Sequence, residues 1–122
     1  VRQASDKGLI VEFHAEALCA SGCTFVLASG TPGHRFINKG ALFLVHSMQQ
    51  GDEKKLSCVE HVDMPTTQDE KATNVIFDLM RDAYVKYTGR PASEIENWLT
   101  CGNERVGPGK LAVDLHIADA TE

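Results

Sequence analysis

The sequence lacks several features that would place it in a specialised class. Its 122 residues contain no apolar run close to the length of about 20 residues that spans a membrane. Basic residues are outnumbered, with 12 Lys and Arg against 17 Asp and Glu and a formal net charge of −5. A protein that binds the phosphate backbone of nucleic acid shows a basic face and a net positive charge. We therefore expect no membrane partner and no nucleic-acid partner.

Cysteine is sparse, and its positions match no metal-binding motif. The four cysteines form neither a C-x-x-C pair nor a zinc-finger spacing, so no metal and no other cofactor is expected. Cys19 and Cys23 are four residues apart and could face each other across one helical turn, whereas Cys58 and Cys101 are distant in sequence. Free cysteines are commonly buried, which favours buried free thiols for most of them. An oxidising compartment stays open, and the interpretation slightly favours the cytoplasm over the periplasm.

The chain does contain enough apolar material for one core. Hydrophobic residues make up 43% and charged residues 24%, which is ordinary for a globular protein. A chain of this length buries roughly two-thirds of its unfolded surface when it folds. Composition therefore predicts one folded domain over residues 1–122 and argues against disorder.

Short apolar runs alternate with helical patterns. Strands are predicted at residues 9–14, 34–37 and 41–46, a buried helix from Ser21 to Gly30, turns at 31–33 and 38–40, and a turn, short helix and short strand near the carboxyl end. This alternation predicts an α/β fold.

The middle of the chain contains a polar stretch followed by a strong helix signal. Residues 47–63 are polar and charged without a clean period, so we predict a loop insertion over 50–64. Thr67 and Glu70 have the spacing of a capping box, and apolar residues behind them recur at three- and four-residue steps. We expect a long amphipathic helix that ends at Gly89, with the next helix opening at Pro91.

Ser21 is the first candidate for chemistry. It lies where a predicted strand ends and a helix begins, at the positive end of the helix dipole. The N–H groups of Gly22 and Cys23 have no acceptor within the helix and could stabilise an oxyanion. Gly22, without a side chain, would let a substrate approach closely. On this tetrapeptide alone the simpler interpretation is that Ser21 caps the helix.

His46 is the second candidate. It ends the apolar run of residues 41–45, at the carboxyl end of a predicted strand, where open α/β sheets place functional groups. A base within hydrogen-bond reach of Ser21 is what acyl transfer requires. A structural, hydrogen-bonded histidine is the alternative interpretation. We expect the remaining histidines to be solvated or structural: His14, His34, His61 and His116.

These residues together resemble the Clp protease proteolytic subunit family. In that family a nucleophilic serine opens a helix, the pattern F-x-L-A-x-G-T-x-G-x-R-F follows, and a strand then delivers the catalytic histidine. The matching positions are Phe25, Leu27, Ala28, Gly30, Thr31, Gly33, Arg35 and Phe36. The 25-residue spacing from Ser21 to His46 also matches, as do the segments 88–96 and 111–119. The resemblance covers residues 9–119 and is nearer to divergent Clp-like proteins than to the housekeeping protease.

The resemblance implies a fold, a mechanism and a set of residues. The fold would be a fragment of the ββα superhelix shared by Clp proteases and crotonases, with short parallel strands and packing helices. The mechanism would be peptide-bond hydrolysis by a triad of Ser21, His46 and an acid, with the N–H of Gly22 in the oxyanion hole. The family's acid falls in the window 102–105, where Glu104 is the choice and Asn103 the alternative.

The family also implies a substrate groove and partners. Residues after the catalytic histidine run beside the substrate backbone, which makes Ser47, Met48 and Gln49 the substrate-binding candidates. Upstream, the family has a strand ending in Gly-Gly that supplies a second oxyanion donor. No such strand precedes residue 9 here, so the chain reads as an amino-terminally shortened member. A peptide or unfolded protein substrate, a homo-oligomer and a partner ATPase are the expected associations.

Two other functions stay open. The chain could be a catalytically inactive Clp-like relative that serves assembly or peptide binding. It could also be a crotonase-like acyl-CoA enzyme, since the two families share their architecture. That second alternative needs an oxyanion hole but no Ser–His pair, so Ser21 and His46 count against it.

Overall fold

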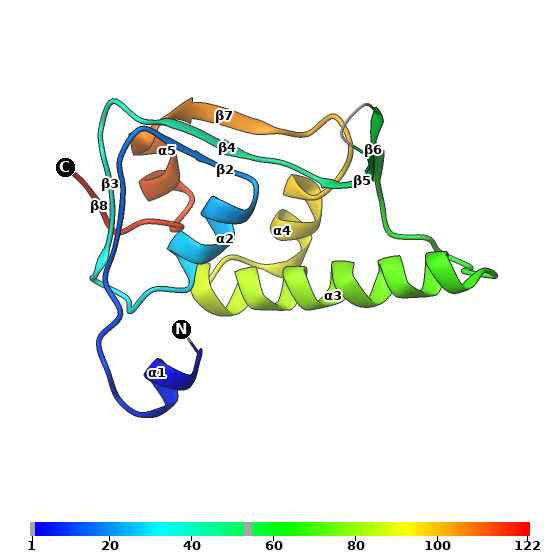
Figure 1. Cartoon of the computed structure of the whole chain (residues 1–122), viewed down its shortest axis with the longest axis horizontal. Helices are drawn as coiled ribbons and strands as arrows, with labels where there is room; N and C mark the ends of the chain where they lie inside the picture. The colour runs from blue at the N-terminus through cyan, green and yellow to red at the C-terminus, as the bar shows by residue number, and fades with distance from the viewer. Residues whose placement is uncertain (1, 53–54) are drawn as a thin grey trace.

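The computed structural model describes residues 2–52 and 55–122, which form a mixed α/β fold of short strands and five helices. The elements in chain order are α1 (Arg2–Asp6), β1 (Phe13–Ala15), β2 (Leu18–Ala20), α2 (Gly22–Ala28), β3 (Arg35–Ile37), β4 (Leu42–Val45), β5 (Met48–Asp52), β6 (Lys55–Val59), α3 (Gln68–Thr88), α4 (Ala92–Trp98), β7 (Arg105–Pro108), α5 (Gly109–Asp114) and β8 (Ala120–Thr121). Figure 1 shows α3 running along the bottom of the molecule, with β2, β4 and β7 along the top and β3 and β8 at the left-hand end.

The strands form two small sheets and a hairpin. The first sheet has the order β1-β3-β8 with every pair parallel, and the second has the order β2-β4-β7. In the second sheet β2 runs parallel to β4, while β7 is antiparallel to it. The chain crosses from the first sheet to the second twice, from β1 to β2 and from β3 to β4. The ends of β2 and β4 therefore lie in adjacent strands, which brings together the segments that follow them.

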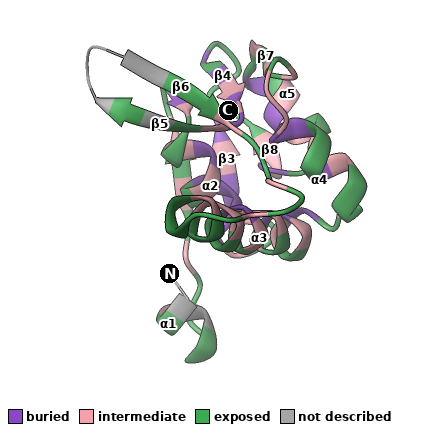
Figure 2. Cartoon of the chain, turned by 90° about the vertical axis from the view of Figure 1, so that its right-hand side faces the viewer, coloured by how far each residue is buried: buried purple, intermediate pink, exposed green. Residues whose placement is uncertain are grey.

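The core fills the space between the sheets and the helices. The side chains of strand β4 alternate between buried and more exposed positions, as the sequence predicts. Phe43 and Val45 are fully buried and Leu42 is exposed. Buried side chains of α3 and α4 complete the core, including Tyr84, Trp98 and Ile95. Figure 2 shows the buried residues gathered in this interior, whereas α1 and the β5–β6 hairpin are mostly exposed where described.

A buried ion pair joins the first sheet to the end of the chain. Arg35 is 5% exposed, and its guanidinium contacts both carboxylate oxygens of Asp119, at 2.9 and 2.7 Å. The same guanidinium donates to the carbonyls of Ala28 and Tyr87. This bidentate geometry, together with the backbone acceptors, satisfies a charge that would be costly to bury alone.

Helix α3 confirms the start and stop signals in its sequence. Thr67 accepts from the N–H of Glu70, and the Glu70 carboxylate accepts from the N–H of Thr67, which completes the capping box. Gly89 ends the helix with φ 71°, a left-handed conformation that glycine adopts without a Cβ penalty. Of the helices in the described ranges, none combines the length and the apolarity that a membrane crossing needs.

The structure differs from the sequence-based expectations at three places in the chain. Residues predicted as a loop insertion over 50–64 instead supply most of an antiparallel hairpin, in which β5 pairs with β6 from Met48↔Val59 onward. Its polar strands pair with each other away from the core, so they carry no hydrophobic alternation that sequence inspection could detect. Strand β7 was also not expected, and the strand predicted at 9–14 is confined to 13–15.

The expectation of free thiols is also wrong. Cys19 is bonded to Cys23, and Cys58 to Cys101, so the four cysteines form two disulfides. The Cα–Cα distances are 5.1 and 5.9 Å, within the range that a disulfide spans. The second bond links β6 to the loop after α4, a contact that only the folded chain creates.

Candidate active site

Ser21 occupies a sharp turn between β2 and α2. Its backbone angles are φ 55° and ψ −120°, a conformation that residues with a side chain rarely adopt. Such strain costs of the order of 1–3 kcal/mol and persists only where the surrounding structure enforces it. In α/β-hydrolases a tight strand-to-helix turn of this kind exposes the nucleophile. Ser21 is exposed to solvent here.

The interpretation of Ser21 as a simple helix cap is wrong. The residue stands at the N-cap position, but its side chain makes no capping hydrogen bond. Its carbonyl is held instead, because the N–H and the hydroxyl of Thr24 both donate to it, at 3.1 and 2.6 Å. The backbone of Ser21 is therefore fixed while its hydroxyl is not used by the helix.

Thr24 is in turn held by Tyr84 from α3. The two hydroxyl oxygens are 2.9 Å apart, and since Thr24 donates to Ser21, the Tyr84 hydroxyl donates to Thr24. Burial raises the pKa of Tyr84, which keeps this phenol protonated as a donor. Sequence reasoning did not find this support, because Thr24 and Tyr84 are 60 positions apart and no local pattern signals their contact.

Gly22 lies in the open beside Ser21. A Cβ built on Gly22 would meet nothing within 4 Å, so packing does not require a glycine here. The residue opens α2, where first-turn N–H groups lack acceptors within the helix. Space above an unpaired N–H is what an oxyanion would need.

His46 follows β4 directly and is held by the backbone next to it. Its Nδ1 lies 2.5 Å from the carbonyl oxygen of Ser47. A carbonyl only accepts, so Nδ1 carries the hydrogen, and in the neutral imidazole Nε2 then keeps its lone pair. This is the tautomer that a general base acting through Nε2 requires.

Ser21 and His46 line the same cavity. It has a volume of about 750 Å³ and is bounded by α2, the end of β4, the start of β5 and one face of α3. The predicted residues Gly22, Ser47, Met48 and Gln49 line it too, and its apolar walls come mainly from Phe25, Val26, Ile76, Met80 and Tyr84. No hydrogen bond joins Ser21 to His46 in the described part of the chain; catalytic pairs are often looser without substrate.

Glu104 lies nearby but does not contact His46. The pairing of β4 with β7 ends at Val45↔Arg105, so His46 and Glu104 leave the second sheet at the same end. Glu104 is exposed and is not among the residues that line the cavity. The Nδ1 position that a triad acid would occupy is taken by the Ser47 carbonyl. The neighbouring Asn103 is half-buried, and its carbonyl accepts from Arg105.

Strand β5 gives the cavity an extended wall. Met48 and Gln49 open this strand and pair with Val59 and Cys58 of β6 on one side. The hairpin is a two-stranded sheet, so within the described residues the other edge of β5 pairs with no strand. Ser47 just before it is buried, and its hydroxyl lies 2.8 Å from Cys58 Sγ.

The other four histidines lie outside this cavity. His14 donates hydrogen bonds to Glu122 and Glu12. These bonds raise the pKa of His14, and the bond to Glu122 has the larger effect. His34 also contacts Glu12, while His61 lies near Asp78 and His116 contacts the carbonyl of Thr88. Throughout residues 2–52 and 55–122, no three or more Cys, His, Asp or Glu side chains are placed to hold a metal ion.

The comparisons with known proteins bear on the fold. No protein-family model matches this chain, and no curated protein matches it. Among solved structures it is similar to a peptidase from Plasmodium falciparum, with a TM-score of 0.74 and 15% identity. The alignment covers 99% of this chain and 59% of that one, so the chain spans about three-fifths of that peptidase's length. The chain therefore has the fold of part of a known peptidase.

Proposed function

We propose that this chain carries the nucleophile and base of a Clp-like serine peptidase. The main support is the strained turn at Ser21. The Ser21 hydroxyl makes no capping hydrogen bond, and Ser21 lines the same cavity as His46. Backbone strain of this kind is maintained at functional sites and has no role in a helix cap. The similarity of fold to a solved peptidase supports the same reaction class.

The residues act in the order that acyl transfer requires. The Ser21 hydroxyl attacks the peptide carbonyl while Nε2 of His46 takes its proton. The N–H of Gly22 stabilises the oxyanion, and His46 then protonates the leaving amine. Water repeats the sequence in the second half of the reaction, releasing the acid product and restoring Ser21. A substrate that enters the cavity must bring Ser21 and His46 into contact.

Glu104 is the proposed acid of the triad. Glu104 stands at the same end of the second sheet as His46, and as the triad acid it would take the place of the Ser47 carbonyl at Nδ1. Glu104→Gln tests this role: a triad acid would lose at least about tenfold in kcat, whereas an exposed loop residue would lose nothing. Asn103→Ala is the matched comparison within the same loop.

The substrate proposed is a peptide or an unfolded protein segment. The free edge of β5 can pair with an extended backbone, which is a common mode of peptide recognition. Met48 and Gln49 open this strand at the cavity and Ser47 precedes it, so these three are the proposed contacts. The apolar walls from α2 and α3 would receive a hydrophobic side chain.

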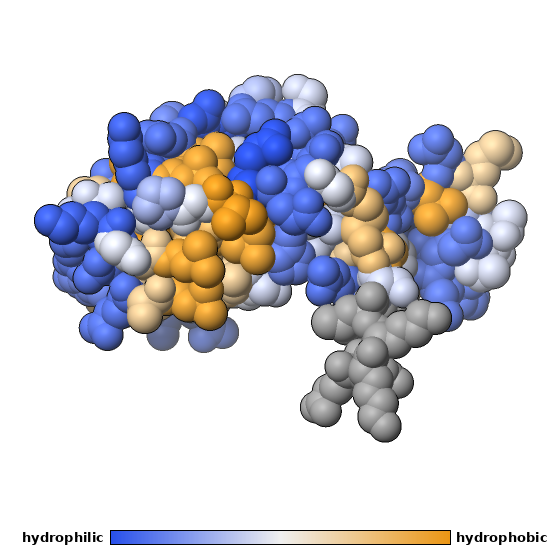
Figure 3. Space-filling view, turned by 90° about the horizontal axis from the view of Figure 1, so that it is seen from above, coloured by the Kyte–Doolittle hydropathy of each residue, from blue (hydrophilic) through white to orange (hydrophobic). Residues whose placement is uncertain are grey.

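The whole protein is proposed to work as a homo-oligomer, with an ATPase as a further partner. Leu18, Leu42 and Val106 are more than half exposed on neighbouring strands of the second sheet. Figure 3 shows an apolar patch on the face where these strands lie. The chain exposes 7450 Å², about 1,000 Å² more than a compact monomer of its mass. Sedimentation of Leu42→Lys against the natural chain tests whether this face holds copies together.

Labelling with a fluorophosphonate tests the nucleophile directly. We expect the probe to attach to Ser21, to disappear in Ser21→Ala, and to slow by at least about 10²-fold in His46→Ala, since a general base contributes that much. Ser29→Ala is the matched control, because Ser29 ends the same helix with a buried hydroxyl bonded to Val26. It should label normally.

The outcome also decides between the alternatives. A folded chain that shows no labelling, but binds an extended peptide along β5, would be an inactive relative that serves peptide binding or assembly. Binding of an acyl-CoA in the cavity, unchanged in Ser21→Ala and His46→Ala, would instead indicate a crotonase-like enzyme.

A further inference from the structure

Each disulfide lies beside one of the two residues proposed for catalysis. Cys19 and Cys23 bracket Ser21 on both sides, and their bond closes a ring of five residues with Ser21 at its centre. Cys19 is buried in β2 and Cys23 lies in the first turn of α2. The bond therefore joins the strand to the helix across the strained turn, where it opposes relaxation of the φ angle of Ser21.

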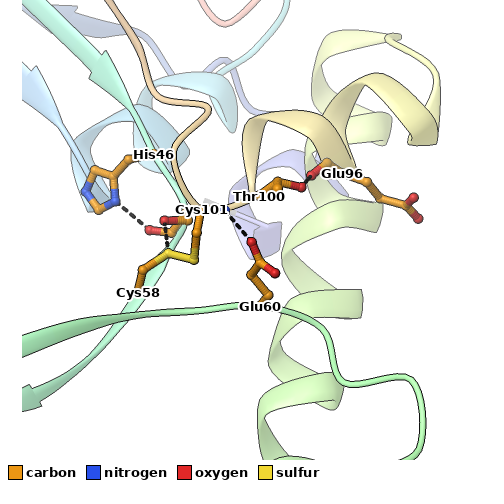
Figure 4. Close-up of a disulfide and its surroundings, with 7 residues drawn as sticks. His46, Cys58, Glu60, Glu96, Thr100 and Cys101 are labelled. Carbon is orange, nitrogen blue, oxygen red and sulfur yellow. Dashed lines mark hydrogen bonds between the residues drawn. A yellow bond between two sulfur atoms is a disulfide. The ribbon is translucent and has the colours of Figure 1, made fainter.

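The second disulfide reaches His46 through Ser47. Cys58 Sγ carries no hydrogen in the disulfide, so the Ser47 hydroxyl donates to it, at 2.8 Å. The carbonyl of the same serine accepts from His46 Nδ1. Figure 4 shows His46 beside the Cys58–Cys101 bond, with Glu60 on the other side of Cys101. Ser47 is 3% exposed, His46 is half-buried, and Cys58 lies at the surface, so the Ser47 end of these contacts is the shielded one.

Cys101 is itself held firmly. Its N–H donates to the Glu60 carboxylate at 2.8 Å, which ties the chain after β6 to the loop after α4 a second time. The disulfide links Cys58 to the loop after α4, and the Ser47 hydroxyl contacts Cys58. The chain of contacts runs from α4 through Cys101, Cys58 and Ser47 to the imidazole of His46.

We infer that the two disulfides are positioning elements of the proposed site: Cys19–Cys23 holds the backbone of Ser21, and Cys58–Cys101 holds the imidazole of His46 through Ser47. In this arrangement the Ser47 carbonyl selects the tautomer of His46. The inference rests on the proposed function. It extends the proposed function by making the reactivity of Ser21 depend on the two disulfides. Extracytoplasmic compartments keep cysteines in this oxidised state.

Reduction offers the first test. Dithiothreitol supplies two electrons and two protons for each bond, the S–S bond breaks, two thiols form, and the reagent closes to a cyclic disulfide. We expect the rate of fluorophosphonate labelling at Ser21 to fall at least tenfold, because a misplacement of about 1 Å can cost 10²-fold. Circular dichroism must show that the reduced chain remains folded.

Two double variants separate the two bonds. Cys58→Ala with Cys101→Ala should slow labelling, shift its pH profile, and convert the ¹⁵N spectrum of His46 from one tautomer to a mixture. Cys19→Ala with Cys23→Ala should slow labelling equally at every pH and leave the His46 spectrum unchanged. A bond that only stabilised the fold would lower the melting temperature and leave the labelling rate of the folded chain, the tautomer and the pH profile unchanged.

Ser47→Ala provides a variant in which both disulfides remain. It removes only the hydroxyl that contacts Cys58, and we expect it to reproduce the His46 mixture even if the cysteine variants do not fold. Wild-type labelling rates and a single His46 tautomer in the reduced chain and in all three variants would overturn the inference. Failure of the oxidised natural chain to label at all would reject the proposed function instead, while the His46 spectra would still decide the second disulfide's role.

Discussion

The Arg35–Asp119 pair and the Ser21 turn lie at opposite ends of α2, and they use their polar groups in opposite ways. At Arg35 the guanidinium is satisfied by a carboxylate and two carbonyls, and the Asp119 carboxylate also accepts from the N–H groups of Gly33 and Arg35. At Ser21 the backbone is strained and the hydroxyl makes no capping bond. The Arg35–Asp119 pair stabilises the fold, whereas the strained turn at Ser21 destabilises it.

The difference indicates where this fold can accept change. Neither partner of a buried ion pair can be replaced without a loss of stability, because the remaining charge is then uncompensated. A strained residue in an open cavity can be replaced with little loss of stability, and even with a gain, although its chemistry is lost. Four predictions test this contrast between the two regions.

Replacement of Arg35 should give the largest effect. Arg35→Met keeps the apolar stem but leaves Asp119 without its cation, so we expect a loss of about 3–5 kcal/mol in the free energy of unfolding. Urea denaturation measures it. The control is Arg81→Met, since Arg81 pairs with the half-exposed Asp78 and with the exposed Asp82 and Glu96, and surface pairs contribute about 1 kcal/mol or less. Equal losses in the two variants would remove the contrast.

A Cβ at Gly109 should come next. It would lie 2.3 Å from the backbone oxygen of Asn38, so Gly109→Ala forces β3 and α5 apart, and we expect a loss of about 1–3 kcal/mol. Gly22→Ala is the counterpart at the cavity, where a Cβ meets nothing within 4 Å, and its stability should be unchanged or slightly higher. Thermal melts compare the two. A tolerated Gly109→Ala would show that the scaffold is looser than its contacts indicate.

Acid should weaken the Arg35 region specifically. The bond to Arg35 is the main cause that holds the pKa of Asp119 below its ordinary value of 3.8. A carboxylate with a depressed folded pKa contributes its stability fully above the unfolded pKa and loses it as the pH falls through the folded value. We therefore expect that, at pH values below about 4, the urea concentration at the unfolding midpoint decreases more for the natural chain than for Asp119→Asn. The effect should be smaller than that of Arg35→Met, because protonation leaves the bonds to Ala28 and Tyr87 in place. Parallel pH profiles of the two chains would contradict it.

The smallest effect should have the opposite sign. Ser21→Gly and Ser21→Ala both remove the hydroxyl, but only glycine relieves the strain of the positive φ angle, so the glycine variant should be more stable by about 1 kcal/mol. At Ser29, with φ −77°, the order should reverse, because alanine loses less entropy than glycine there. Neither Ser21 variant should react with a fluorophosphonate. A more stable alanine at position 21 would mean that Ser21 is not strained.

Sequence reasoning succeeded where the signal is local. The capping box at Thr67, the stop at Gly89 and the helix after Ser21 depend on residues within one or two turns, and all three are present. The hairpin of β5 and β6 was missed because its strands are polar and form by pairing with each other. The spacing of Cys19 and Cys23 did suggest that they face each other, but the Cys58–Cys101 bond was missed because 43 positions separate its cysteines.

The sequence by itself determined the alternation of strands and helices, the position of Ser21 before a helix, and that of His46 after a buried strand. Those features depend on hydrophobic periodicity and on the termini of single elements, which neighbouring residues control. Only the tertiary structure decided that Ser21 and His46 share a cavity, that Tyr84 supports Thr24, and that Ser47 rather than Glu104 meets Nδ1 of His46. These contacts join residues brought together by the sheet register and by a disulfide spanning 43 positions, so they exist only once the chain has folded.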